Sequence, residues 1–309
     1  DLLNSRANSL STSLVPYGHI YASSRAGGFT NRVCAVREIW DGITDIENAK
    51  KMASQNIEES AKLLRRVFSD LKKGGAVINI IGTAAGIKIC KNILPKFIKE
   101  ADIRPLKGRR KNSDKDFYSL INLSGQAEKQ NPEFIQIGGS VGFNAYSFPS
   151  TLYDSKESLA DRVFCHILST SSLWKTVRMA GGAYGVYLFP SADSGITKFL
   201  TYRDPHPFES LKALGSCIEE AINRGVSKEE TEKAIIGCYS DEVTPKSPSG
   251  RGSTGFLRCL YGMDEKQKVK RIKTLLSITS KDLMQAALRY KENIAKGRNV
   301  ILFVFFLKL

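Results

Sequence analysis

Apolar residues in the first third of the chain recur with helical spacing. They stand four and three residues apart, at Ile57, Ala61, Leu64, Phe68 and Leu71. Such spacing places side chains on one face of a helix. Asp45 can cap the start of this helix, and Gly74 and Gly75 are typical of its end. The apolar run 76–81 then predicts a buried strand, and residues 84–101 predict a second helix that bends near Pro95.

The second part of the chain has a different pattern. Residues 133–148 alternate apolar with small or polar residues, which predicts a half-exposed strand whose glycines leave the backbone open to another chain. Segments 183–189 and 198–203 flank a turn rich in Pro, Ser and Gly and predict a hairpin. Further helices are expected after a capping box at 154–157 and near residues 207–223, 227–239, 264–276 and 280–294. A buried strand is expected at 300–307. A loop is expected at 244–253, and a less regular segment at 3–43.

The order of these elements indicates the fold class. Strands and helices come as a hairpin followed by helix pairs, without strict β-α-β alternation. This order predicts an α+β fold, with helices packed on one face of a mostly antiparallel sheet. A length of 309 residues is enough for about two domains. We divide the chain into a first domain at residues 1–103, a basic linker at 104–130 and a second domain at 131–309.

Composition excludes several classes of protein. Hydrophobic residues make up 42% and charged residues 25% of the chain, as in an ordinary globular protein. The apolar run 300–307 is too short for a membrane helix, which needs about 20 residues, so no membrane partner is expected. The six cysteines are scattered without a C-x-x-C pair, which is typical of buried free thiols. Because the chain begins at Asp1 instead of Met, we expect a processed or excised part of a longer protein.

The net charge of +15 raises nucleic acid as a partner. Much of the excess lies in residues 104–115, a basic run that contains Pro and Gly but lacks interleaved aromatic residues. Such a run is typical of a solvated linker, and no nucleic-acid-binding motif accompanies it. We therefore expect no specific nucleic-acid partner, while attraction of acidic ligands or a preference for particular peptides stays open.

Histidines do not supply a metal site in this sequence. His206, Pro207, Phe208 and Glu209 match the first four positions of a His-x-x-Glu-His zinc motif, but Ser210 stands where the second ligand is required. Pro207 also indicates the start of a helix instead of its interior. We therefore predict no metal ligands in this chain. The sequence also lacks a P-loop.

The strongest candidate for chemistry is a bend near residue 180. Arg178 closes an amphipathic helix, Gly181 and Gly182 form a tight turn, and Tyr184 opens the next strand. In one interpretation Arg178 binds carbonyl groups of the last helical turn while Tyr184 packs in a strand. In the other, the guanidinium and the phenol together hold the carbonyl of an extended peptide, as donors do at an oxyanion site. The residues alone leave both interpretations open.

Several motifs together resemble the C-terminal half of presequence-protease-like zinc metallopeptidases, in the pitrilysin and insulin-degrading-enzyme superfamily. The first is Arg-x-x-Gly-Gly-Ala-Tyr-Gly at residues 178–185, followed by Thr-Tyr-Arg-Asp-Pro at 201–205. Similar segments are Gly-His-Ile-Tyr at 18–21, Ser-Pro-Ser-Gly-Arg-Gly-Ser at 247–253 and Thr-Ser-Lys-Asp-Leu at 279–283. The resemblance covers nearly the whole chain, and its motifs are specific only in combination.

The resemblance implies two halves, each of two related α+β domains, that close around a peptide chamber. In that family the zinc and its ligands belong to the N-terminal half, which is the expected partner of this chain along with unfolded peptide substrates. The chain would contain the end of the third domain, incomplete, and the fourth domain. Arg178 and Tyr184 would bind the substrate carbonyl while zinc-bound water attacks it. Gly181, Gly182, Gly139 and Phe143 are the expected substrate-binding residues.

By itself the chain is expected to be inactive. The alternative is a non-enzymatic scaffold or peptide-binding subunit of the same fold. The expected compartment is the cytoplasm if the source is bacterial, or the matrix of a mitochondrion or plastid if it is eukaryotic.

Overall fold

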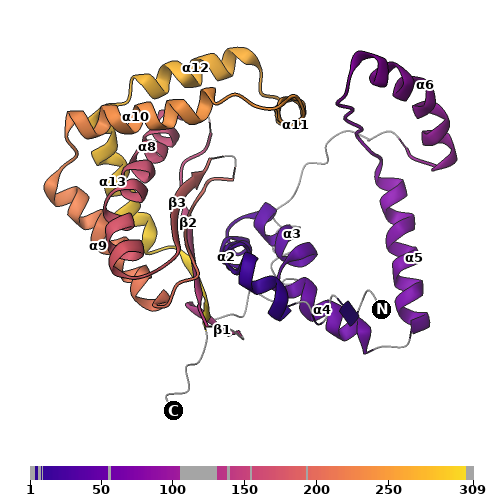
Figure 1. Cartoon of the computed structure of the whole chain (residues 1–309), viewed down its shortest axis with the longest axis horizontal. Helices are drawn as coiled ribbons and strands as arrows, with labels where there is room; N and C mark the ends of the chain where they lie inside the picture. The colour runs from indigo at the N-terminus through magenta and orange to yellow at the C-terminus, as the bar shows by residue number, and fades with distance from the viewer. Residues whose placement is uncertain are drawn as a thin grey trace. The chain divides into compact units, whose positions relative to one another are not determined.

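The computed structural model describes residues 10–54, 57–104, 131–137, 140–153, 155–192 and 194–303, together with residues 4, 5 and 8. Figure 1 shows the order of its elements. The helices before the sheet are α2 (Leu10–Gly28), α3 (Arg32–Asp41), α4 (Ile43–Ala53), α5 (Ile57–Gly74) and α6 (Ala84–Glu100). The later helices are α8 (Lys156–Thr170), the π-helix η1 (Trp174–Ala180), α9 (Pro207–Arg224), α10 (Lys228–Val243), α11 (Pro248–Tyr261), α12 (Glu265–Leu276) and α13 (Ser280–Ile294).

The described strands form one sheet in the order β1-β5-β2-β4-β3. They are β1 (Glu133–Gln136), β2 (Phe143–Pro149), β3 (Gly185–Ser191), β4 (Ile196–Tyr202) and β5 (Arg298–Phe303). β1 runs parallel to β5 and the other pairs are antiparallel, so the predicted α+β class and mostly antiparallel sheet are confirmed. The predicted hairpin is β3–β4, and the predicted last strand is β5 as far as residue 303, since residues 304–307 lie outside the described range.

Helices lie on both faces of this sheet (Figure 1). On one face, α8, α9 and α13 pack over a large hydrophobic core that includes Phe164 and Phe199. On the other face, α2 lies across β2, β4 and β5 and closes a smaller core around Phe143 and Leu200. The sheet is thus buried between two helical layers, whereas the sequence pattern indicated only one.

The prediction of a less regular segment at residues 3–43 is wrong where the structure describes it, because α2 and α3 occupy most of it. Pro16 inside α2 lowers its intrinsic helix propensity, which hides the helix in the sequence. Packing against the sheet overrides that preference. Gly18 permits the close approach, since a Cβ at this position would lie 2.4 Å from the Phe143 ring.

The packing separates the described elements into two compact units. The first contains the sheet, α2, α3, most of α4, α8, η1, α9, α10 and α13, and the second contains α5, α6, α11 and most of α12. The predicted boundaries at residues 103 and 131 stay a prediction. The basic linker at 104–130 lies outside the described residues except for Arg104.

The second unit corrects two expectations. The run 76–81 is not a buried strand: Val77 and Ile78 are 48% and 42% exposed, and no described strand pairs with them. A short apolar run does not by itself supply the neighbouring strand that would bury it. The expected loop at 244–253 instead leads into α11, because Ser247 caps the helix by accepting a hydrogen bond from the backbone of Gly250 at 3.1 Å and Pro248 begins it.

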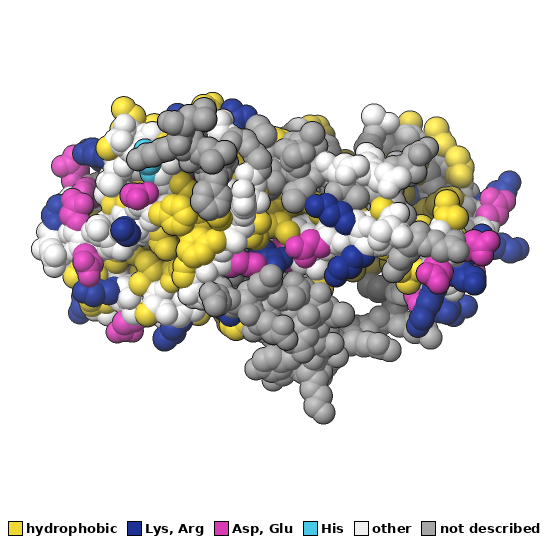
Figure 2. All heavy atoms as spheres, turned by 90° about the horizontal axis from the view of Figure 1, so that it is seen from below, with side chains coloured by type: hydrophobic (Ala, Val, Ile, Leu, Met, Phe, Trp, Pro, Cys, Tyr) yellow, Lys and Arg dark blue, Asp and Glu magenta, His cyan; other side chains and the backbone are white. Residues whose placement is uncertain are grey.

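Charged side chains of both signs are interspersed on the face drawn in Figure 2, with hydrophobic side chains grouped between them. On this face the described Lys and Arg residues do not form a continuous basic surface. Among the helices that the structure describes, none is both long and apolar enough to span a bilayer.

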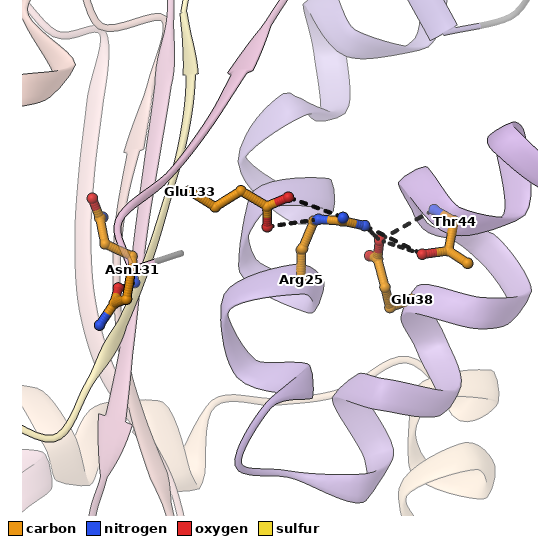
Figure 3. A network of polar contacts seen from close by, with 6 residues as sticks. Arg25, Glu38, Thr44, Asn131 and Glu133 are labelled. Atoms are coloured by element: carbon orange, nitrogen blue, oxygen red, sulfur yellow. Dashed lines mark hydrogen bonds and ion pairs between the residues drawn. The ribbon is translucent and has the colours of Figure 1, made fainter. Parts of the chain in front are cut away.

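A buried ion network joins α2 and α3 to the edge strand β1 (Figure 3). Arg25 of α2 donates through Nη1 to Glu38 of α3 at 2.7 Å, and through Nε and Nη2 to the two carboxylate oxygens of Glu133 at 2.9 and 3.0 Å. Glu38 also accepts from the backbone N–H and the hydroxyl of Thr44, both at 3.2 Å. Burial raises the pKa of Glu38, although the Arg25 charge opposes this effect.

We expect Arg25→Met to destabilise the chain strongly. The change removes the cation that compensates two carboxylates, one of which is fully buried. Breaking a buried ion pair from one side lowers the free energy of unfolding by about 3–5 kcal/mol. Urea denaturation measures this loss. A loss comparable to that of an ordinary surface substitution contradicts the structural importance of the network.

Glu38→Gln is the matched control, because the amide oxygen still accepts hydrogen bonds from Arg25 and Thr44. We expect a loss of only about 1 kcal/mol at neutral pH. Since burial raises the pKa of Glu38 in the folded state, the folded chain binds this proton more readily than the unfolded chain. Wild type should therefore gain stability relative to Glu38→Gln as the pH falls from neutral toward 4.5, the ordinary pKa of the group.

Candidate functional site

The bend between η1 and β3 is built by one backbone hydrogen bond of π-helical type and one of α-helical type. The N–H of Gly181 donates to the carbonyl of Thr176 at 2.9 Å, five residues earlier, and the N–H of Gly182 donates to the carbonyl of Arg178 at 3.1 Å. The predicted helix end is thus a wide turn, a feature found frequently at functional sites. The turn holds Arg178 and Tyr184 on the two sides of one bend, as the sequence predicts.

Two glycines make the bend possible for different reasons. Gly182 adopts a left-handed conformation with φ of +77°, which other residues rarely adopt. At Gly181 the limit is space, because a Cβ there would lie 2.6 Å from the carbonyl oxygen of Val177. Neither position can accept an ordinary side chain without a shift of the backbone.

Arg178 is held by aromatic rings. Its guanidinium carbon lies 4.1 Å from the centroid of the Trp174 ring and 5.7 Å from that of Tyr184. Both distances are within the range of a cation–π interaction. Among the residues that the structure describes, no carboxylate forms an ion pair with Arg178. The guanidinium is therefore oriented while its N–H donors stay available for a ligand.

Tyr184 is 63% exposed and stands immediately before β3. Its ring makes an edge contact with Tyr202 of β4 at 5.8 Å, and its N–H donates to the carbonyl of Arg203 at 3.3 Å. Two reciprocal backbone hydrogen bonds between Gly142 and Asp204, at 2.9 and 2.8 Å, fix the chain directly after β4. The phenol thus projects from a firmly anchored backbone.

Helix α2 also contributes a residue to the surroundings of the bend. The ring of His19 contacts Tyr202 edge to face at 4.8 Å and lies stacked 6.4 Å from Tyr187. Burial lowers the pKa of His19, and its Nδ1 has no hydrogen-bond partner among the described residues. The neutral ring therefore supports Tyr202 from behind by packing.

Sequence reasoning missed Trp174, Tyr202 and the contact of His19. Trp174 had a usable signal, since it lies four residues before Arg178 on one helical segment. Tyr202 could have been found from the hairpin register, which pairs it with Gly185 beside Tyr184. The contact of His19 crosses from a distant helix and leaves no local signal.

The predicted substrate-binding role of Phe143 does not fit its position. Phe143 is 1% exposed and belongs to the core between the sheet and α2. Its strand β2 lies between β4 and β5, so both of its edges are already paired. The expectation of a half-exposed strand open to a peptide is therefore wrong for residues 143–148. Gly139 lies outside the described residues.

The outer edge of β3 is also protected. Ser169 of α8 accepts a hydrogen bond from the N–H of Leu188 at 3.3 Å and donates to its carbonyl at 3.1 Å. Pro190, two residues further on the same edge, has no N–H. These features oppose addition of a peptide strand to β3. A ligand at the bend would be held mainly by side chains.

Within the described residues, no group of three or more His, Cys, Asp and Glu side chains could hold a metal ion. His206 precedes α9 at its N-cap, and its N–H donates to the carboxylate of Asp204 at 2.9 Å. The chemistry that the bend can perform is therefore hydrogen bonding from a fixed cation and a phenol to an acceptor such as a carbonyl oxygen.

Comparison with known proteins identifies similar sequences along nearly the whole chain. The family described as PreP C-terminal domain matches residues 132–305. A mitochondrial presequence protease of Gibberella zeae is 25% identical over 309 residues, covering 98% of this chain and 29% of the relative. A chloroplastic and mitochondrial presequence protease of Arabidopsis thaliana is 25% identical over 278 residues, covering 87% and 24%. A protein of Borreliella burgdorferi without an assigned function is 24% identical over 298 residues, covering 95% and 29%.

The chain thus spans less than a third of the length of these relatives. Among solved structures, a peptidase M16 inactive domain from Pseudomonas fluorescens aligns with a TM-score of 0.48 and 14% identity, over 70% of this chain and 50% of that one.

We expect alanine at either glycine of the bend to destabilise the chain. Gly182→Ala places a side chain at a left-handed position, which lowers the free energy of unfolding by about 1–2 kcal/mol. Gly182→Asn should restore part of the loss, because asparagine adopts this conformation more readily. Gly181→Ala should also destabilise, by displacing the carbonyl of Val177. Chemical denaturation measures all three variants.

Gly215→Ala in α9 is the matched control. A Cβ at Gly215 would meet nothing within 4 Å, and alanine is favoured over glycine in a helix by roughly 0.5–1 kcal/mol. This variant should therefore be as stable as wild type or more so. If all of these alanine variants behaved alike, the bend would not have the constraint that we assign to it.

Proposed function

Because the chain belongs to the PreP C-terminal domain family, we propose that it is the non-catalytic C-terminal part of a zinc metallopeptidase that degrades unfolded peptides. In this proposal it closes the peptide chamber and holds the substrate through Arg178 and Tyr184, with the glycine bend at Gly181 and Gly182 near the bound backbone. The N-terminal part of the same protein is its partner.

One observation carries the proposal. Arg178 lies between Trp174 and Tyr184 without a carboxylate partner in the described part of the chain. An arginine that only stabilises the fold usually has its charge compensated or its donors satisfied. Arg178 instead has its guanidinium held over the Trp174 ring, and it stands beside an exposed phenol. This arrangement is suited to a ligand that brings its own acceptor.

The proposed chemistry is stabilisation of charge on a carbonyl oxygen. The guanidinium of Arg178 and the hydroxyl of Tyr184 donate hydrogen bonds to the substrate carbonyl, and these bonds strengthen as negative charge develops on its oxygen. Since the described residues of this chain do not fit a metal, zinc would be held by the other part of the protein, where it would supply Lewis-acid chemistry.

Exposed apolar surface on α5 supports a partner within the same protein. Ile57 and Leu71, at the two ends of this helix, are 82% and 65% exposed, and Phe68 between them is 61% exposed. An amphipathic helix normally buries such a face. The N-terminal part of the same protein is the proposed cover.

The compartment follows from the source of the chain. The relatives named above include mitochondrial and chloroplastic proteins. We place this protein in the matrix of such an organelle if its source is eukaryotic, and in the cytoplasm if its source is bacterial.

The chain alone should neither hydrolyse peptides nor bind zinc. Incubation with an unfolded peptide followed by mass spectrometry measures hydrolysis, and metal analysis after dialysis measures zinc content. Stoichiometric zinc or cleavage by the chain alone would refute the proposal. If the whole protein binds peptides without cleaving them, the scaffold alternative is correct.

In the whole protein, Tyr184→Phe and Arg178→Ala should each lower kcat/KM by about 100- to 1000-fold, the usual effect of removing one oxyanion donor. Zinc content should be unchanged in both variants. Trp174→Leu should lower kcat/KM less, because it only releases the guanidinium from its stacked position. Steady-state kinetics with an unfolded peptide measures these effects.

The matched controls are Tyr261→Phe on α11 and Arg224→Ala on α9, which remove the same groups from exposed positions elsewhere. Both should retain the activity of wild type. Unchanged kinetics in Tyr184→Phe and Arg178→Ala would be incompatible with their proposed role.

A further inference from the structure

A second arginine lies at the same site. Arg203 directly follows β4, and its guanidinium carbon is 5.3 Å from the ring centroid of Tyr202. Tyr202 in turn contacts Tyr184, whose backbone N–H is bonded to the carbonyl of Arg203. These contacts therefore form one continuous row of three aromatic rings and two cations. Its members, in order, are Trp174, Arg178, Tyr184, Tyr202 and Arg203.

The backbone presents Arg203 in an unusual conformation. Its φ is +49°, in the left-handed region that residues other than glycine rarely adopt. The reciprocal hydrogen bonds between Gly142 and Asp204 hold the next residue in place. Such conformations cluster at ligand-binding sites, where the surrounding structure maintains them.

The positive charge of Arg203 is not compensated in the described part of the chain. Arg203 is exposed, and no described carboxylate forms an ion pair with it. The neighbouring Asp204 is fully buried, and its Oδ1 accepts from the N–H of His206. The row thus carries two guanidinium groups, each oriented by an aromatic ring and each with free donors.

We propose that Arg203 is a specificity-determining residue that binds a carboxylate of the peptide held by Arg178 and Tyr184. This inference rests on the proposed function and adds to it the chemical class of the preferred peptides. A carboxylate matches the planar donor geometry of a guanidinium, which binds it through two parallel hydrogen bonds. The net charge of +15 also attracts negatively charged groups of a peptide at long range.

The carboxylate can come from two parts of a peptide. One is the free C-terminus, and the other is the side chain of an internal Asp or Glu. Both present the same two oxygens to Arg203. Peptides that differ in only one of these groups distinguish the two sources.

Trp174 provides a direct measurement of binding. The chain has two tryptophans, of which Trp40 is 74% exposed on α3. Trp40→Phe therefore leaves Trp174, in contact with Arg178, as the only indole reporter. In this background, short unstructured peptides of Gly, Ser and Leu are titrated while tryptophan fluorescence is recorded. One pair of peptides differs in a free or amidated C-terminus, and a second amidated pair differs in a central Glu or Gln.

The 309-residue chain with Arg203 intact should prefer the peptide that carries the carboxylate in at least one pair. It should bind this peptide about tenfold more tightly than the other member of the pair, as expected for one charge-assisted bidentate contact. The preference should disappear in Arg203→Asn, where asparagine still tolerates the left-handed backbone. Arg203→Lys should retain part of it, because the charge stays while the paired donors are lost. Lys228→Gln, which removes one charge from α10, should leave the preference intact.

Two results overturn the inference, and they differ in what else they overturn. If peptides bind but the preference persists in Arg203→Asn, or if wild type shows none, the assignment of Arg203 is wrong while the proposed peptide-holding function stands. If peptides bind only to the whole protein, the same peptide pairs and variants are compared there by competition with a labelled peptide. If no peptide binds to this chain or to the whole protein, both the inference and the peptide-holding role of Arg178 and Tyr184 are wrong.

Discussion

The buried ion network centred on Arg25 is the constraint on which the arrangement of the site depends. Arg25 connects two helices to a strand 108 residues further along the chain, and both of its ion-pair partners are carboxylates. Ion pairs in this environment are sensitive to geometry, because a displaced carboxylate would be buried without compensation. The network therefore fixes where α2 lies along the sheet. A nonpolar contact would tolerate a shift more easily.

The position of α2 in turn determines the back of the candidate site. His19 precedes Arg25 by less than two helical turns and contacts Tyr202, which contacts Tyr184. Gly18, beside it, allows the helix to approach Phe143 closely. The polar network at one end of α2 and the glycine near its middle thus determine how closely α2 packs against Tyr202. The exposed phenol of Tyr184 rests on that packing.

The sequence predicted the local parts of this structure and missed the distant ones. The bend from Arg178 to Tyr184 and the following hairpin were predicted because glycine positions and strand alternation are encoded within a few residues. The apolar run at Ile78 was assigned to a strand, since its pattern does not reveal whether a partner strand exists. Helix α2 was missed because its stability comes from burial against a sheet formed by residues more than a hundred positions away.

Arg178 at the bend is oriented by an aromatic ring instead of by a carboxylate. A carboxylate partner would orient Arg178 well, but it would also neutralise the charge and occupy the donors that the proposed substrate requires. Contact with the Trp174 ring instead holds the guanidinium without neutralising its charge. Arg203 on Tyr202 repeats this solution. Each ring is held by the fold and each guanidinium by a ring, so the site keeps two cations in place without an ion-pair partner among the described residues. This is the condition for binding an acceptor that arrives from outside the chain.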